Sequence, residues 1–198
     1  MNVTFKAAVA ALILTVAFAR SVAAGPREDA LDAVERRDYA TAISLWRARA
    51  DQGEVDAQYH LGAMYDRGQG VTRDYAVAVS WFRKAADQDF AAAQLSLGVM
   101  YENGLGVPQD FTTAVSWYRR AADQGNAAAQ LNLGVMYENG WGVTQNYVTA
   151  HMWFSLAAAS GDEDGARNRD INAAKLTPAQ IVQAEKLTRE WQPKFNPR

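Results

Sequence analysis

The chain has no cysteine, only five prolines and no block of five or six like charges. Without cysteine it can form no disulfide, thiolate metal site or cysteine nucleophile. Binding to nucleic acid depends on clustered Lys and Arg that neutralise the phosphate backbone. The sequence lacks such clusters, and its formal net charge is −2. The composition therefore argues against nucleic acid as a partner.

What the chain does have is an apolar content of 49%, which is typical of a folded protein rather than a disordered one. Its 198 residues are enough for one domain, or for one array of repeats preceded by a leader. No stretch shows the alternating apolar and polar pattern of a β-strand. We therefore expect an all-α protein.

The N-terminal residues have the features of an export signal. Lys6 precedes an apolar run over residues 7–19, which is shorter than the roughly 20 residues that a membrane-spanning helix needs. We predict a signal peptide over residues 1–24, cleaved near Ala24, with cleavage after Ala19 or an uncleaved membrane anchor as alternatives. Cleavage would remove two basic residues and no acid, leaving 18 basic against 22 acidic residues. The mature protein is then expected in the periplasm or secreted, and only the leader before cleavage would contact the membrane.

One motif occurs three times at a spacing of 36 residues, at Ala57–Tyr65, Ala93–Tyr101 and Ala129–Tyr137. Each copy has helical spacing and runs into a Gly-x-Gly-Val loop, which leads to a second segment with helical spacing. A fixed period of 20–50 residues is typical of a solenoid, in which each unit buries its apolar face against its neighbours. The second segments begin at residues suited to capping a helix, namely Asp74, Asp110 and Asn146.

Glycine occupies the same place in the first helix of every unit, at Gly62, Gly98 and Gly134. A glycine inside a helix costs about 1 kcal/mol relative to alanine. Its recurrence in phase indicates that another helix crosses close to this point. The second helices alternate alanine with large aromatic residues, a pattern that favours close helix packing.

The repeats are flanked by segments that depart from the pattern. The N-terminal flank keeps only part of the repeat pattern, around Asp38-Tyr39. In the C-terminal flank, Pro178 after Thr177 predicts the start of a final helix. A terminal unit is expected to differ because its outer face meets water. The predicted division is a signal peptide over 1–24, a degenerate helix pair over 25–53, repeats over 54–89, 90–125 and 126–161, and capping helices with a tail over 162–198.

These motifs support a family resemblance. Ala-Gln-x-x-Leu-Gly-x-Met-Tyr, Glu-Asn-Gly-x-Gly-Val and Ala-Ala-Asp-Gln-Gly resemble Sel1-like repeats, which are relatives of tetratricopeptide repeats with a longer loop inside the unit. The resemblance covers about residues 54–161. It implies a right-handed α–α superhelix whose concave face is built from the first helices. It also implies an adaptor or scaffold that binds other proteins, often in exported bacterial proteins.

The helical wheel places a set of first-helix residues opposite the buried leucines. In a stack of repeats they would form an apolar strip edged by carboxylates, which suits a peptide or helix from a partner protein. Packing against the neighbouring repeat is an equally good explanation of the same positions. The candidate partner-binding residues are Tyr59, Ala63, Asp66, Leu95, Val99, Glu102, Leu131, Val135 and Glu138.

Trp141 is a further candidate for partner binding. It occupies the variable position of the third loop, where Gln69 and Leu105 stand in the other two. Tryptophan is favoured at the energetic centre of interfaces. The alternative is that its ring packs beneath its own loop.

Catalytic and metal sites have little support in the sequence. His151 stands where Val115 does and is expected in the core with a hydrogen-bonded ring, while His60 is at a polar flank position. Neither has a partner at the spacing of metal ligands. We therefore predict no cofactor, no metal and no enzyme activity, but a scaffold for a protein or peptide partner in envelope signalling or complex assembly. The alternative is a cell-envelope hydrolase or a cell-wall-fragment binder.

Overall fold

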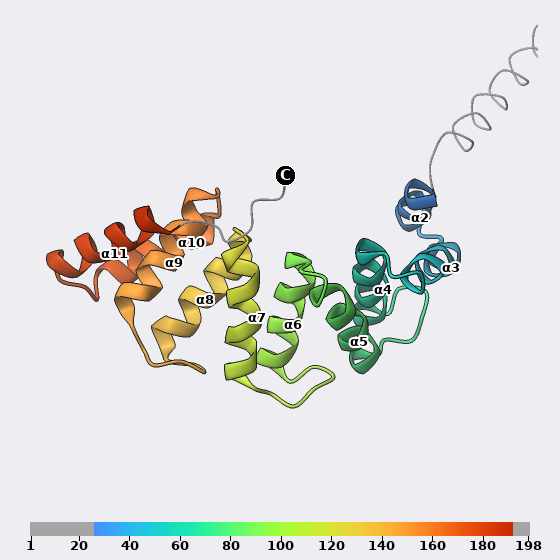
Figure 1. The fold of residues 1–198 in the computed structure, drawn as a ribbon, viewed down its shortest axis with the longest axis horizontal. Coiled ribbons are helices and arrows are strands. Elements are labelled where there is room, and N and C mark those ends of the chain that lie inside the picture. Colours follow the sequence, from blue (N-terminus) through green and yellow to red (C-terminus); the bar gives the residue numbers. More distant parts are fainter. Residues whose placement is uncertain (1–25, 192–198) are drawn as a thin grey trace, which may run out of the picture.

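The computed structural model describes residues 26–191, and these form helices joined by turns and loops, with no strand among them. The helices follow one another along an arc (Figure 1). This confirms the right-handed α–α superhelix expected from the sequence. The predicted leader lies outside the described residues. In chain order the helices are α2 (Pro26–Glu35), α3 (Tyr39–Ala50), α4 (Val55–Arg67), α5 (Tyr75–Ala86), α6 (Ala91–Asn103), α7 (Phe111–Asp123), α8 (Ala127–Asn139), α9 (Tyr147–Ala159), α10 (Glu163–Ala173) and α11 (Pro178–Glu190).

Side-chain caps fix where the second helices begin. Asp74, Asp110 and Asn146 each accept a hydrogen bond from a backbone N–H in the first turn of α5, α7 and α9. Such a bond satisfies one of the amides that a helix N-terminus leaves without a partner. The first helices α4, α6 and α8 end at glycines in the left-handed conformation, Gly68, Gly104 and Gly140.

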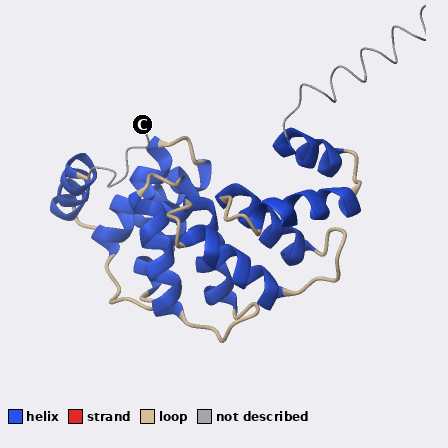
Figure 2. Ribbon diagram, turned by 45° about the vertical axis from the view of Figure 1, so that its right-hand side comes forward, coloured by secondary structure: helices blue, strands red, loops and turns tan. Residues whose placement is uncertain are grey.

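The second glycine of each loop is required by a close approach of two backbones. A Cβ on Gly106 would lie 2.4 Å from the carbonyl carbon of Tyr75, and one on Gly142 would lie at the same distance from that of Phe111. Each loop therefore rests on the start of the preceding second helix. Figure 2 shows the three long loops along one edge of the arc. The Gly-x-Gly pattern thus serves the stacking of repeats.

The glycines inside the first helices mark the predicted helix crossing. A Cβ on Gly98 would lie 2.3 Å from the ring of Tyr118, and one on Gly134 would lie 2.5 Å from the ring of Phe154. Gly62 meets Phe82 in the same way, at 2.8 Å. The second helix of each repeat therefore places an aromatic ring directly against the first helix.

The core consists of three clusters of alanines and large side chains from successive helices. One cluster lies between α2, α3 and α4, the next between α4, α5 and α6, and the third between α7, α8 and α9. Trp46, Tyr118 and Trp153 are among the largest fully buried side chains. Because each cluster draws on neighbouring units, no repeat buries its apolar surface alone.

A ladder of buried glutamines joins consecutive repeats. Gln94 donates to the carbonyl of Ala86, 3.2 Å away, at the end of the preceding second helix. Its Oε1 atom accepts from Gln124, 2.8 Å away. Gln58 makes the equivalent bonds with Ala50 and Gln88. These contacts satisfy carbonyls that a helix C-terminus would otherwise leave without a partner.

Helices α10 and α11 cover the C-terminal end of the array. Both pack on α9, and a capping box between Thr177 and Gln180 begins α11. α9 accordingly buries Met152 and Leu156 where earlier second helices carry exposed polar residues. Between residues 26 and 191, no helix combines the length and apolarity that crossing a membrane would need.

Candidate functional site

The candidate site is the face of α4, α6 and α8 that lies opposite the buried leucines. In the middle of the array, Val99 on α6 is 37% exposed. Leu95, Leu131 and Val135 are half-buried around it at corresponding positions. An exposed valine surrounded by half-buried apolar side chains is a surface suited to a partner's apolar side chain. This is the most open part of the face.

Packing closes the N-terminal end of this face. The ring of Tyr59 lies 5.7 Å from that of Phe82 and 5.2 Å from that of Phe90, centroid to centroid. Ala63 is only 8% exposed and belongs to the core cluster between α4, α5 and α6. Ala63 is therefore not part of an exposed strip, and its burial among residues of α4, α5 and α6 fits the alternative of packing between repeats.

Leu95 shows that one position can serve both purposes. It packs against the core cluster of the following repeat, yet it is only half-buried. Of the two explanations that the sequence left open, contact between repeats is therefore present at Leu95, and contact with a partner stays a prediction. The leucine side chain is long enough to cover the contact between the two repeats while part of it stays exposed to solvent.

The carboxylates along the face are held by different partners. Glu102 accepts a hydrogen bond from the hydroxyl of Tyr118. Burial, and then this contact with Glu102, raise the pKa of Tyr118, so the phenol stays protonated and donating. Glu138 instead accepts from Asn172 of α10 and from Lys175 in the turn after it, at 3.0 and 3.1 Å. Asp66, the corresponding residue of the first repeat, is half-buried.

Trp141 packs on the preceding repeat and is also partly exposed. Its ring stacks on that of Phe111, with centroids 5.7 Å apart and planes 21° apart. It nevertheless remains 42% exposed. The stacking holds the indole in one orientation at the rim of the array, which lowers the entropy lost if a partner packs on it.

Comparison with known proteins identifies the repeats. The Sel1 repeat family matches residues 55–90, 91–126 and 127–162, which together make up more than half of the chain. The chain belongs to the Sel1 repeat family. Members of this family are typically scaffolds for protein interactions and are generally not catalytic. No curated protein matches the chain.

Two solved structures support the same fold. A protective antigen of uropathogenic Escherichia coli strains, described as displaying an SLR fold, is 43% identical with a TM-score of 0.72. That match covers 76% of this chain but 32% of the antigen, so the chain spans about a third of its length. A Sel1 repeat protein from Oxalobacter formigenes is 32% identical with a TM-score of 0.70, over 81% of this chain and 68% of that one.

The two histidines of the Sel1 array are placed for packing. His151 is 5% exposed, and burial lowers its pKa. His60 stacks on Trp46 with ring centroids 4.4 Å apart, and burial likewise lowers its pKa. Both imidazoles are therefore neutral at pH 7. Within the described part of the chain, no three His, Asp or Glu residues are grouped so as to hold a metal ion.

Sequence reasoning missed a second row of functional candidates in the Sel1 array. An arginine near the end of α3, α5 and α7 donates to a tyrosine hydroxyl on the next first helix. The signal was present, because both residue types recur every 36 positions. The periodicity does not show which arginine and tyrosine meet, because each pair joins one repeat to the next. The pairs are Arg47 with Tyr65, Arg83 with Tyr101 and Arg119 with Tyr137.

Proposed function

We propose that this protein is an exported Sel1 scaffold that binds a protein or peptide partner on the face formed by α4, α6 and α8. The observation that carries the proposal is the exposure of Val99, beside half-buried Leu95 and Val135 at the centre of the array. An amphipathic helix or an extended segment could bury these side chains. Its binding would help to assemble an envelope complex or to modulate envelope signalling.

The charges on the face would select where a partner carries its basic residues. Glu102 lies on the face and has a hydroxyl rather than a cation as its hydrogen-bond partner, so its negative charge stays uncompensated by that contact. Glu138 is compensated by Lys175. A partner with Lys or Arg opposite the middle repeat is therefore favoured over one with a basic residue opposite the last repeat. Trp141 would add an aromatic contact at the rim.

The export part of the proposal rests on Lys6 and the apolar run over residues 7–19. It is tested by expressing the full chain in a bacterial host, fractionating the cells and sequencing the N-terminus of the product. A periplasmic protein that begins near Gly25 is expected. A cytoplasmic protein that retains residues 1–24 would contradict export without affecting the binding face.

The binding face is tested by cross-linking and affinity capture with the double variant Val99→Asp and Val135→Asp. Two charges at the centre of the face should abolish recovery of a partner that the native chain recovers, because each carboxylate would have to be desolvated against apolar side chains. The matched control is Val182→Asp on α11, where the valine is 61% exposed and away from the face. Equal helicity by circular dichroism establishes that all three chains fold. Undiminished recovery with the double variant would refute the proposed face.

A further inference from the structure

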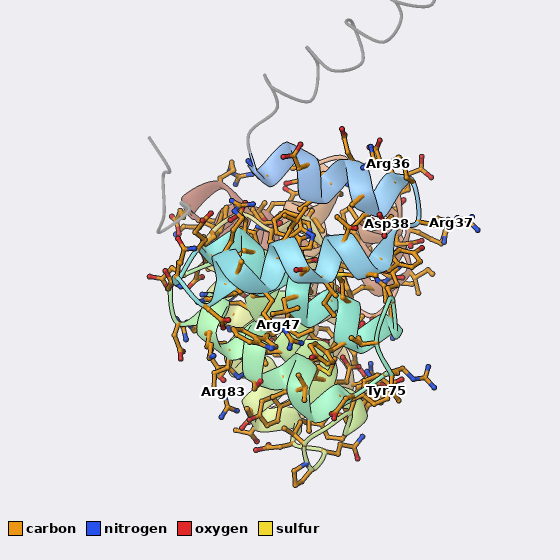
Figure 3. The ribbon with its side chains drawn as sticks, turned by 90° about the vertical axis from the view of Figure 1, so that its right-hand side faces the viewer. Arg36, Arg37, Asp38, Arg47, Tyr75 and Arg83 are labelled. Atoms are coloured by element: carbon orange, nitrogen blue, oxygen red, sulfur yellow. The ribbon has the colours of Figure 1, made fainter. Side chains whose placement is uncertain are left out.

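The three arginine–tyrosine pairs form a regular row along the outside of the second helices. Arg47, Arg83 and Arg119 occupy the same position in α3, α5 and α7. Each guanidinium donates to the hydroxyl of a tyrosine on the following helix. Arg47 and Arg83 are exposed, and Arg119 is half-buried. Figure 3 labels Arg47 and Arg83 on successive layers of the stack, apart from the turn that carries Arg36 and Arg37.

Aromatic rings support the cations of this region. The guanidinium of Arg119 lies 4.9 Å from the ring centroid of Trp153. Beside the row, Lys84 lies 3.7 Å over Trp81, and Arg120 lies 4.7 Å over Trp117. Contact with a ring face restricts a long cationic side chain without neutralising its charge. Arg119 is therefore held in one orientation before any ligand arrives, whereas Arg47 and Arg83 are held by their tyrosine hydroxyls alone.

The row carries three positive charges, with an aspartate four residues after each arginine, at Asp51, Asp87 and Asp123. Among the described residues, no carboxylate forms an ion pair with Arg47, Arg83 or Arg119, whereas Arg120 pairs with Asp89 at 3.1 Å. A guanidinium has five N–H donors arranged as a fork that fits a carboxylate. A tyrosine hydroxyl accepts a hydrogen bond from only part of these N–H donors. Unused donors on three aligned cations therefore remain for an anionic ligand.

The row ends where the capping helices begin. In α9 the corresponding position is Ser155, which donates to the carbonyl of His151, and the next residue is the buried Leu156. Basic residues thus occupy this position on the exposed second helices and are absent from the one that α10 and α11 cover. This distribution indicates that the charges serve the open surface rather than the fold.

We propose that the arginine row, defined as Arg47, Arg83 and Arg119 with their tyrosines, binds an extended acidic segment of another protein. Arg47, Arg83 and Arg119 recur once per repeat, on the alternate helices α3, α5 and α7. An extended chain rises roughly 3.3 Å per residue. Carboxylates separated along such a chain would therefore each meet a different arginine. This is a second surface, distinct from the face around Val99, and it selects a partner of opposite charge.

The residues on either side of the described range do not supply the acidic occupant, because residues 1–25 and 192–198 contain no Asp or Glu, and the C-terminal segment adds Lys194 and Arg198. One arginine per repeat is also too sparse for nucleic acid, which carries one phosphate per roughly 3.4 Å of each strand. A polypeptide with spaced carboxylates fits the row better than either.

The test is fluorescence anisotropy with two labelled peptides of about 12 residues, built from Glu, Gly and Ser. One has Glu at every third position, and the other has the same composition with its Glu residues adjacent. The spaced peptide should bind more tightly at low salt, and its binding should weaken at about 0.15 M salt. Arg83→Gln should weaken binding about tenfold, because it removes a charge-assisted fork. The triple change of Arg47, Arg83 and Arg119 to Gln should abolish binding.

Three controls make the outcome specific. Arg67→Gln removes an exposed arginine outside the row and should leave binding unchanged. Arg83→Lys keeps the charge but loses the fork, so its affinity should lie between those of the native chain and Arg83→Gln. Val99→Asp with Val135→Asp should not weaken binding, which separates failure of this inference from failure of the proposed face. Equal binding of both peptides, no effect of Arg83→Gln, or tighter binding of a single-stranded oligonucleotide would each overturn the inference.

Discussion

The middle repeat, α6 and α7, and the last repeat, α8 and α9, share a backbone plan but differ where they meet the next helix pair. In the middle repeat Gln94 is satisfied on both sides, by Ala86 and Gln124. In the last repeat Gln130 still donates to Ala122, but its buried Oε1 has no partner among the described residues. The cause is Ser160, which stands where Gln124 does and is too short to reach.

The carboxylates differ for a related reason. Tyr118 supplies the hydroxyl that holds Glu102, but the corresponding residue of the last repeat is Phe154, which has none. Glu138 is bound instead by Asn172 of α10 and by Lys175 in the turn that follows α10. The outer side of α9 likewise changes from cationic to apolar. The comparison teaches that a repeat becomes terminal through a few substitutions at its junction, while its internal helix crossing stays the same.

The largest effect is expected from Leu156→Arg, which restores to α9 the cation found at Arg120. Leu156 is 8% exposed beneath the capping helices, so an arginine there would be buried without a partner. We expect a loss of about 3 kcal/mol in the free energy of unfolding, measured by urea denaturation, together with faster amide exchange in α10 and α11.

The reverse change in the middle repeat is the control. Arg120 is exposed and paired with Asp89, so Arg120→Leu should cost no more than about 1 kcal/mol. Equal losses for the two variants would show that α9 is not specialised for its cap.

The next effect concerns the crossing that the two repeats share. Gly98→Ala and Gly134→Ala would each drive a methyl group against a fully buried ring, that of Tyr118 or Phe154. Each should lower the unfolding free energy by about 2 kcal/mol, because the clash outweighs the better helix propensity of alanine. Thermal denaturation of the two glycine variants and the native chain measures this loss of stability. Ser96→Ala, in the same helix but away from the crossing, should change stability by less than about 0.5 kcal/mol.

A smaller effect is expected from completing the glutamine ladder. Ser160→Gln should let position 160 donate to the unpaired Oε1 of Gln130 and raise the unfolding free energy by about 1 kcal/mol. The converse change, Gln124→Ser, should lower it by a similar amount by leaving Gln94 half satisfied. The urea midpoints of the two variants are compared with that of the native chain. If both midpoints shift in the same direction, the missing glutamine contact does not explain the difference between the repeats.

The smallest effect is a change in pH dependence. Burial lowers the pKa of His151 in the folded state, so the unfolded chain takes up a proton at a higher pH than the folded chain does. Stability is therefore fully present above the ordinary histidine pKa and falls as the pH drops through it. His151→Val, which copies Val115, should flatten the curve of unfolding free energy between pH 7.5 and 5.5. The slope that remains comes from His60, whose pKa is lowered in the same direction. An unchanged slope would contradict the burial argument.

Much of the fold was predictable because the repeat spacing is exact in the sequence. The positions of Gly98 and Asp110 predicted the crossing and the cap, whereas only the structure showed the contact of Gly106 with the preceding second helix. The site was less predictable, since a helical wheel shows which side of one helix is apolar but not which neighbour covers it. Ala63 was placed on the surface for that reason, and Glu138 was treated like Glu102 although α10 reaches only one of them. The arginine row was missed because its partners come from different repeats.

Periodicity alone determined that this chain is a stack of helix pairs, since a pattern that recurs in phase can bury its apolar side only against copies of itself. It also determined the places where glycine is needed, because those depend on backbone contacts repeated in every unit. Only the tertiary structure decided which of the equivalent side chains remain accessible. Accessibility depends on the packing of each unit's neighbours, and the units at the two ends of the array have different neighbours from the one in the middle.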